Sequence, residues 1–480
     1  MDVGGRSPDL LIFPSPALLA PIPHLSNLSA MPDPDPSQSS HLAYEFPDDE
    51  RPSTASPTEG VLESQTPGTP GARGHDPYAA WRHRNYRWYS AGWMVAVIGY
   101  QVQAVAIGWE VYDRTRDEMA LGWLALIQAI PVLLLALPAG HLADRFDRRK
   151  IVFYTAILQG LCGLGLAWLS YRPGSLPWMF ALMGLTGMVM AIGRPARSAL
   201  LPQVVPMSVF NNAVTWNSSI FEVSSMVGPA LGGAVIAWSV RSAYMIDGCC
   251  ALIFGIFVLF ITARPVDRQN ESGSIWSNLA AGIRFVWKKE IILATITLDL
   301  FAVLFGGATY LLPVYAKDIL HVDEFGFGLL RAAPAVGAFT MALLLAHLPP
   351  MKQAGRNLLV AVALFGVATV VFGWSRWFWL SVGALVAAGA FDNVSVVIRH
   401  TLVQVLTPDD MRGRVSAVNQ VFIGASNELG GLESGLTAKW FGPVASVVGG
   451  GIGTLAVVAA AAVCWPKLRR FGTLHDAGPK

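Results

Sequence analysis

Several ionisable side chains lie inside long apolar runs of this 480-residue chain, where an uncompensated charge is costly. They include the carboxylates of Glu110, Glu222, Asp299, Asp392, Glu428 and Glu433 and the guanidinium of Arg331. A carboxylate in a dry cavity favours its neutral form, so it can carry a proton at neutral pH. The carboxylates expected to contact protons or substrate are Asp299, Asp392, Glu222 and Glu428, with Asp299 ahead of Asp392.

Structural roles compete with this chemistry at several of these positions. Glu110 and Glu433 lie near the ends of their apolar runs, so we expect structural roles for both. Arg399 follows Asp392 by seven residues, which is two turns along one helix face. A salt bridge or a helix cap is therefore the alternative to a transport role for Asp392.

The composition indicates a membrane protein without a cofactor. Hydrophobic residues make up 53% and charged residues 14%, whereas soluble domains carry roughly 25% charge. The net charge of +2 argues against a nucleic-acid partner. The sequence has no phosphate-binding glycine loop after a strand, which argues against ATP hydrolysis. It also has no evident catalytic triad or metal-ligand spacing. The 4 cysteines lie in apolar runs, and we interpret them as small hydrophobic side chains.

Successive apolar segments of about 20 residues predict twelve membrane-spanning helices in an all-α fold. The expected spans are 88–111, 120–142, 151–171, 177–200, 209–238, 243–263, 291–315, 326–348, 357–374, 377–398, 414–437 and 443–465. A polar linker, 264–290, separates two six-helix halves at 81–263 and 291–470. The proline-rich residues 1–80 are expected to be a disordered tail, and 471–480 form a short C-terminal tail.

Lys and Arg concentrate in alternate loops, which predicts the orientation of the chain. The loop 140–150 carries four basic residues against two acidic ones, so we assign it to the cytoplasmic side. Arg82, Arg84 and Arg87, interleaved with aromatic residues, are expected to anchor the start of the first helix on the same side. Both termini are then cytoplasmic.

Identities at a constant offset of 202 residues indicate an internal repeat. The pairs are Arg197 with Arg399, Leu200 with Leu402, Pro206 with Pro408, Asn217 with Asn419, Gly228 with Gly430, and Gly233 with Gly435. They fall on the fourth and fifth helices of each half, in the same order. Two parallel six-helix halves of this kind place a substrate site at their shared midplane.

The loop between the second and third spans resembles the signature loop of the major facilitator superfamily. Its matching residues are Gly140, Asp144, Arg145, Arg148 and Arg149, and Asp147 stands where that family usually has glycine. Stretches that resemble the branch of the enterobactin exporter and related secretion-type permeases are 193–202, 227–233, 298–307, 412–419 and 424–430. Gly228, Pro229, Gly232 and Gly233 resemble the core of the exporters' antiporter motif, which would let helices pack closely and bend.

This resemblance implies a major facilitator fold and a function. The implied protein is a proton-coupled secondary transporter that exports a small amphipathic organic molecule, such as a siderophore or a drug-like compound, by alternating access. It would act as a monomer in the bacterial inner membrane, in contact with protons, lipids and its substrate. The alternatives are a lipid or lysolipid flippase on the same fold, and a membrane-embedded enzyme or scaffold.

The resemblance also implies roles for individual residues. Helices 1, 4, 7 and 10 line the cavity in this family, which places Asp299 and Asp392 there and makes Gln101, Gln103 and Trp109 further contacts. Asp144 would act in a cytoplasmic gate. Helices 5 and 8 pack across the two halves, so Glu222 is the expected partner of Arg331, ahead of Glu428. Arg197 and Arg399 are further candidates for charge pairing.

Overall fold

The computed structural model describes residues 76–262, 275–348 and 351–472. Every regular element in these ranges is helical, as expected for an all-α membrane protein. Eleven of the described stretches are long and apolar enough to cross a membrane. The remaining expected span, 414–437, lies on α13 (Asp409–Phe441), a more highly charged helix of 33 residues, or about 50 Å.

The described chain begins before the expected boundary at residue 81. Residues 76–80, which we expected in the disordered tail, contact α5 (Phe210–Trp238). Asn212 Nδ2 and Trp216 Nε1 each donate to the Pro77 carbonyl at 2.8 Å, and Ala80 N donates to Asn212 Oδ1 at 3.0 Å. These contacts tie Asp76–Ala80 to the helices, whereas residues 1–75 and 473–480 lie outside the described residues.

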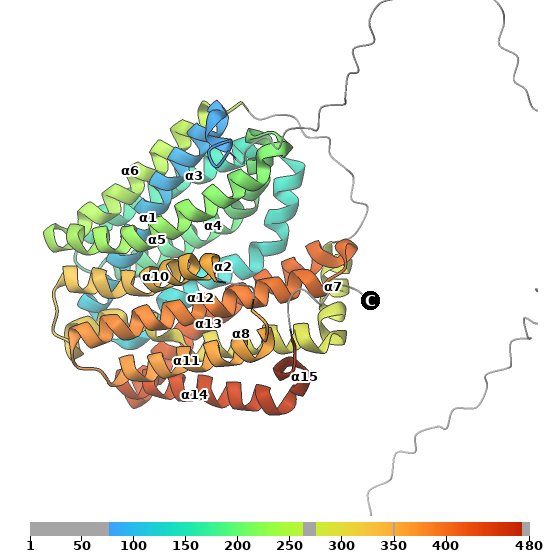
Figure 1. Ribbon diagram of the computed structural model, residues 1–480. Helices are drawn as coiled ribbons and strands as arrows, with labels where there is room; N and C mark the ends of the chain where they lie inside the picture. Colours follow the sequence, from blue (N-terminus) through green and yellow to red (C-terminus); the bar gives the residue numbers. More distant parts are fainter. Residues whose placement is uncertain (1–75, 263–274, 349–350, 473–480) are drawn as a thin grey trace, which may run out of the picture. The chain divides into compact units, whose positions relative to one another are not determined.

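The N-terminal half pairs its long helices by close packing. Its elements are η1 (Ala80–Arg82), α1 (Arg84–Thr115), α2 (Glu118–Arg145), α3 (Arg148–Ser170), α4 (Leu176–Val204), η2 (Met207–Val209), α5 and α6 (Val240–Leu259). Helix α6 packs against α1 and α3, while α2 packs against α4 (Figure 1). The elements follow the predicted spans closely because each apolar run ends at polar or helix-breaking residues.

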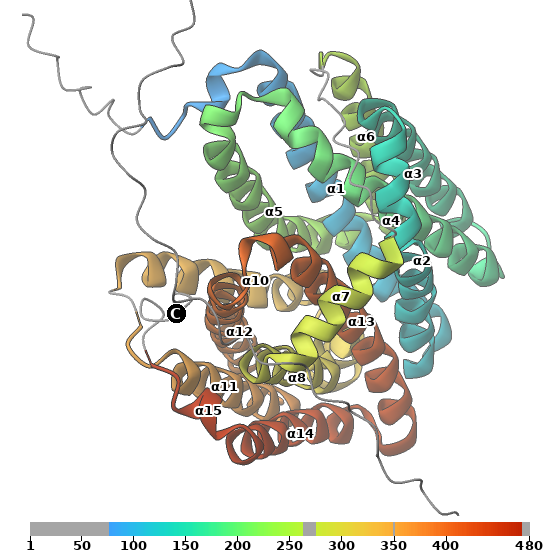
Figure 2. The same ribbon diagram turned by 90° about the vertical axis from the view of Figure 1, so that its right-hand side faces the viewer.

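The C-terminal half has the same helix order with one irregular span. Its elements are α7 (Ile275–Lys288), α8 (Glu290–Phe305), η3 (Gly307–Leu311), α9 (Leu312–Val314), η4 (Tyr315–Ile319), α10 (Glu324–His347), α11 (Ala354–Trp374), α12 (Phe378–Leu406), α13, α14 (Pro443–Cys464) and α15 (Pro466–Arg469). The expected linker 264–290 thus contains a helix, α7, which packs against α13. Two helix pairs, α2 with α13 and α5 with α10, join the halves (Figure 2).

The two joints between the halves are built alike from glycines at repeat-related positions. A Cβ added to Gly233 of α5 would lie 2.7 Å from the Gly328 Cα of α10. A Cβ added to Gly435 of α13 would lie 2.8 Å from the Gly122 Cα of α2. Both distances are too short for a side chain, so the backbones meet directly. Gly233 and Gly435 are one of the pairs at the offset of 202, so the repeat has a structural counterpart.

The proline pair of the repeat also takes equivalent positions. Pro206 directly precedes η2 and Pro408 directly precedes α13, with ψ angles of 150° and 151°. Proline lacks an amide hydrogen, which the start of a helix does not need, so it fits both positions.

The seventh span is broken where it passes between the two halves. Helix α8 ends at Phe305, and a 3₁₀ turn, a short α-turn and a π-turn follow it. Pro313 explains part of the break: it has no amide hydrogen to donate to the carbonyl four residues earlier, at Thr309. Within a membrane, such freed backbone groups need partners from neighbouring protein or a cavity.

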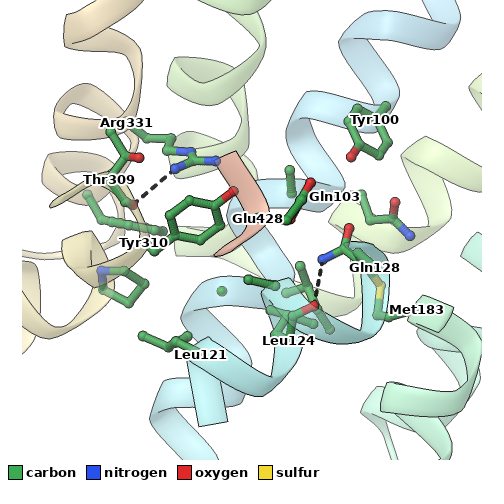
Figure 3. Close-up of a pocket in the computed structure, with 16 residues that line it drawn as sticks. Tyr100, Gln103, Leu121, Leu124, Gln128, Met183, Thr309, Tyr310, Arg331 and Glu428 are labelled. Carbon is green, nitrogen blue, oxygen red and sulfur yellow. Dashed lines mark hydrogen bonds between the residues drawn. The ribbon is translucent and has the colours of Figure 1, made fainter. Parts of the chain in front are cut away.

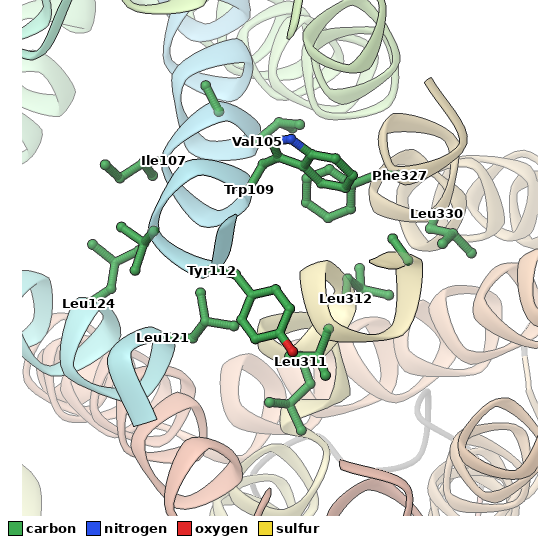
Figure 4. Close-up of a cluster of buried hydrophobic side chains, with 14 of the residues drawn as sticks. Val105, Ile107, Trp109, Tyr112, Leu121, Leu124, Leu311, Leu312, Phe327 and Leu330 are labelled. Atoms are coloured by element: carbon green, nitrogen blue, oxygen red, sulfur yellow. The ribbon is translucent and has the colours of Figure 1, made fainter. Parts of the chain in front are cut away.

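A cluster of buried apolar side chains fills the space between α1, α2, α9 and α10 (Figure 4). Trp109 of α1 stacks on Phe327 of α10 with 5.2 Å between the ring centroids. Leu312 and Tyr112 are buried in the same cluster. The cluster joins the halves near the α1–α2 loop, at the end that the charge pattern predicts to face outward; we call this the outer end.

Candidate functional site

A cavity of about 130 Å³ lies between the two halves (Figure 3). Helices α1, α2 and α4 supply one wall, and η3, α9, α10 and α13 supply the other. Its apolar lining includes Ile107, Leu121, Leu124, Met183 and Phe327. We call it the central cavity. Both halves contribute to its walls, which is the position expected of a transport site in a protein of two related halves.

Arg331 is the positive charge of the central cavity. Its Nη1 donates to the Thr309 carbonyl at 3.0 Å. This is the carbonyl that Pro313 leaves without its helical partner, so the broken span and the buried arginine satisfy one another. The guanidinium retains further donors that can bind substrate.

Glu428 on α13 brings a carboxylate into the same cavity. Arg331 and Arg194 are the positive charges that interact with it, and Tyr310 lies against it. The structure thus gives Arg331 a carboxylate neighbour in Glu428. The expected pairing with Glu222 is not formed: Glu222, half-buried on α5, has no hydrogen-bond or ion-pair partner among the described residues and does not line the cavity. A count of residues along the helices places Glu222 and Glu428 at nearly the same depth as Arg331, but it cannot give the direction in which either side chain points.

Gln103 is the clearest hydrogen-bonding group of the cavity. It is 0% exposed, and neither its amide nitrogen nor its amide oxygen has a protein partner among the described residues. A buried amide without a partner costs about 1–3 kcal/mol, so a ligand that bonds to it gains correspondingly. The neighbouring Gln128 donates to the Leu124 carbonyl at 3.3 Å, which leaves its oxygen free for a ligand. Gln101, by contrast, packs against Gly228 of α5 and is outside the cavity lining.

Asp299, the leading candidate from the sequence, is engaged in a buried ion pair. Its carboxylate contacts Arg399 Nη1, and the two residues are only 7% and 3% exposed. Neither residue lines the central cavity. Arg399 therefore pairs with a carboxylate on α8, while Asp392, two turns before it on α12, faces a second cavity lined by residues of the C-terminal half.

Among the other intramembrane charges that the sequence singled out, Glu110 and Arg197 have structural contacts. Glu110 accepts hydrogen bonds from Ser170 and Tyr244, both at 2.7 Å, and pairs with Arg114 at 2.5 Å. Arg197 places its guanidinium carbon 3.9 Å from the centre of the Trp93 ring. Glu433 lines neither cavity.

The predicted antiporter-type motif on α5 is a packing surface. Gly228 and Gly232 face α1, where an added Cβ on Gly232 would lie 3.1 Å from Val105, and Gly233 faces α10. Pro229 lies within α5, which continues as a helix from Phe210 to Trp238. The motif therefore holds α5 against both α1 and the opposite half.

The predicted gate loop is tied to its own half. Arg148 donates to the carbonyls of Ala143 and Ala199 at 3.2 and 3.3 Å, and Arg149 donates to the last carbonyls of α6. These bonds satisfy carbonyls near the ends of α4 and α6. Asp144 is exposed and pairs with Arg148 at 3.4 Å, while Gly140 and Arg145 lie on α2 just before the loop. Among the residues that the structure describes, Asp144 makes no hydrogen bond or ion pair to the C-terminal half.

The outer end carries a network of charges that links the halves, and the sequence reading missed it. We call it the outer charge network; its members are Tyr112, Asp113, Arg116 and Asp117 from the first half and Lys317, Asp318 and Lys439 from the second. Tyr112 donates to Asp318, and Lys317 pairs with Asp113. Arg116 pairs with Asp318 at 3.3 Å, and Lys439 pairs with Asp117 at 3.1 Å. Together with the stacked Trp109 and Phe327, the network joins the two halves at the outer end.

Sequence reasoning also passed over Asp247 on α6. This aspartate is 1% exposed, and its Oδ2 has no partner among the described residues. A Cβ added to Gly163 of α3 would lie 2.8 Å from that oxygen. The acidic residue in an apolar run was a visible signal, of the same kind as the carboxylates that were selected.

Comparison with known proteins is consistent with this geometry. The model of the Major Facilitator Superfamily matches residues 90–431. The chain is 26% identical over 388 residues to the enterobactin exporter EntS of Citrobacter koseri, which covers 78% of this chain and 91% of that protein. It is 24% identical over 390 residues to the multidrug efflux pump Tap of Mycolicibacterium fortuitum, covering 79% and 95% respectively.

Solved structures show the same fold at low sequence identity. A bacterial homologue of the human lysosomal transporter Spinster, in an inward-facing and occupied conformation, matches with a TM-score of 0.65 and 14% identity, covering 82% of this chain and 99% of that chain. The inward-open xylose transporter XylE of E. coli matches with a TM-score of 0.60 and 13% identity, covering 82% and 98%.

Proposed function

We propose that this chain, which belongs to the major facilitator superfamily and is a multi-pass membrane transporter, exports a small amphipathic organic molecule in exchange for protons. Relatives named as exporters of enterobactin and of multiple drugs support the direction of transport. The observation that carries the proposal is that a carboxylate, Glu428, and a guanidinium, Arg331, line one cavity walled by both halves. A siderophore or a drug-like compound is the substrate class that we favour.

The lining of the central cavity suits an amphipathic substrate. Apolar side chains from both halves can hold a hydrophobic body, and Gln103 can bond to a polar group. Glu428 can accept a hydrogen bond from a hydroxyl or amine of the substrate. A proton on the same carboxylate removes that acceptor, so proton and substrate compete for one group. Such competition couples export of the substrate to entry of a proton when the halves change state only with the carboxylate occupied by one or the other.

The contacts at the two ends support alternating access. At the outer end, the outer charge network and the pair Trp109–Phe327 hold the halves together. At the other end, Asp144 stays within its own half. This arrangement fits a state that admits substrate from the cytoplasm. Opening to the outside requires the network to break, and we retain the loop of Asp144 as the gate that closes behind the substrate.

The remaining parts of the proposal concern location and assembly. The basic residues near η1, the α2–α3 loop and α15 favour a cytoplasmic position for both termini. The bacterial relatives favour the inner membrane. We propose a monomer surrounded by lipid that needs neither a cofactor nor ATP and has no enzymatic activity.

Inside-out vesicles with an imposed proton gradient test the proposal. Accumulation of the dye Hoechst 33342 should depend on the gradient and be lost in Glu428→Gln. The matched control is Glu433→Gln, which removes another carboxylate of α13 that lies outside both cavities. Gradient-independent movement of a fluorescent lysolipid with no dye transport would identify a flippase instead. If a correctly inserted chain moves neither the dye nor the lysolipid, the result would favour the membrane-embedded enzyme or scaffold.

A further inference from the structure

We infer that the second cavity, lined by residues of the C-terminal half, is a subsite for the ammonium group of an amphipathic amine, held by Asp392. This cavity measures about 200 Å³ and is lined by η3, α8, α10, α11, α12 and α13. We call it the amine pocket. The inference deepens the proposed function and rests on it, because it names a chemical group of the transported molecule.

Charge selects a cation in the amine pocket. Asp392 is the only charged side chain among its lining residues, and it has no hydrogen-bond or ion-pair partner among the described residues. The basic residue two turns along α12, Arg399, is already paired with Asp299. The carboxylate of Asp392 therefore faces an apolar cavity with no counter-charge of the protein. A ligand ammonium would supply the missing charge.

The rest of the lining suits an amine with a hydrophobic body. Phe365 and Tyr310 present aromatic rings, which attract ammonium groups as well as apolar atoms. Thr369 already donates its hydroxyl to the Phe365 carbonyl at 3.0 Å, so it contributes no free donor that would favour an anion. Asn427 supplies an amide oxygen that can accept from an ammonium.

The amine pocket adjoins the central cavity and shares part of its lining. Thr309 and Tyr310 line both spaces, and the adjacent residues Asn427 and Glu428 of α13 face one space each. The broken seventh span thus forms the partition. Glu428 already has two positive charges acting on it, Arg331 in the lining and Arg194 outside it, whereas Asp392 has none. A singly charged organic cation supplies the counter-charge that Asp392 lacks, and an organic anion does not.

Binding to the purified full-length chain in detergent tests the inference without requiring transport. The probes are 4-phenylbutylamine, which is protonated at pH 7, and its neutral analogue 4-phenylbutanol, measured by titration calorimetry. The amine should bind at least about tenfold more tightly than the alcohol, since loss of one partner of a desolvated charge pair commonly costs that much or more. Asp392→Asn should remove this preference while leaving the affinity for the alcohol unchanged.

A relocated carboxylate provides the sharper control. Asn427→Asp in the Asp392→Asn background returns a carboxylate to the same pocket, so part of the preference for the amine should return. Glu433→Gln should keep the preference of the wild type. Equal affinities for amine and alcohol in the wild type would overturn the inference. The inference would also be overturned if the preference for the amine survives in Asp392→Asn, or if the single variant Glu428→Gln loses it.

These outcomes separate the inference from the proposed function. Amine binding that depends on Asp392, in a chain that transports nothing in vesicles, would support the amine pocket and contradict the export proposal. Proton-driven dye transport in a chain that shows no preference for the amine would do the reverse.

Discussion

Asp318 is the residue of the outer charge network whose loss should most clearly open the transporter to the outside. It accepts a hydrogen bond from Tyr112 and pairs with Arg116 at 3.3 Å, and both partners belong to the opposite half. A hydrogen bond to a charged group contributes about 1.5–3 kcal/mol. The exposed pair with Arg116 adds about 0–1 kcal/mol. We therefore expect Asp318→Asn to destabilise the outer-closed state by about 2 kcal/mol.

This destabilisation translates into a measurable change in the populations of the two states. A difference of about 2 kcal/mol shifts the ratio of outer-open to outer-closed molecules by about thirtyfold. An outer-open state populated at about 1% would rise to about a quarter. Spin labels on cysteines introduced at Arg172 and Arg376, at the outer ends of the two halves, report this by pulsed electron resonance. The 4 native cysteines are replaced by alanine for the measurement.

A second residue of the network serves as a graded control. Asp117 makes one bond across the halves, to Lys439, and the two side chains are 40% and 50% exposed. Such a pair is worth about 0–1 kcal/mol, so Asp117→Asn should shift the ratio by less than about fivefold. Distance distributions that are identical in the wild type and in Asp318→Asn would refute the idea that this network holds the outer end closed. A larger shift from Asp117→Asn would refute the ranking of the two contacts.

Two further predictions concern stability and the tail. Asp299→Asn should destabilise the protein by about 3–5 kcal/mol because it leaves the 3%-exposed Arg399 without its partner. The double variant Asp299→Leu with Arg399→Met should recover most of this loss, as measured by thermal unfolding. Equal stability of the Asp299→Asn variant and the wild type would contradict a structural ion pair. Deletion of residues 1–75 should preserve folding and transport because it retains Asp76–Ala80 and their bonds to α5; loss of transport by a well-inserted truncation would show a role for the tail.

The architecture could be predicted from the sequence because it depends on one-dimensional properties. Apolar runs long enough to cross a bilayer predict spans, and the offset of 202 residues predicts two related halves. The pairs Gly233 with Gly435 and Pro206 with Pro408 take equivalent places in the structure. Breaks inside a span are harder to detect, although the sequence Gly306-Gly307 followed by Pro313 was a visible sign of one.

The partners of the charged groups could not be predicted in the same way. A count of residues along a helix gives depth, but it does not give the face on which a side chain lies. Glu222 and Glu428 come to nearly the same depth as Arg331, yet only Glu428 reaches the central cavity. Asp299 was expected in the cavity, but its helix turns it toward Arg399. The outer charge network joins loops that are far apart in sequence, and no local sequence pattern predicts such contacts.

Proton movement coupled to substrate tests the central claim most directly. Proteoliposomes that contain the purified chain and the pH-sensitive dye pyranine start at equal pH inside and outside. Addition of Hoechst 33342 outside should drive the compound inward and protons outward, so the interior becomes more alkaline. Glu428→Gln liposomes should show no pH change, and Glu433→Gln liposomes should behave as the wild type. Entry of the compound without any change in internal pH would contradict exchange of proton and substrate at Glu428.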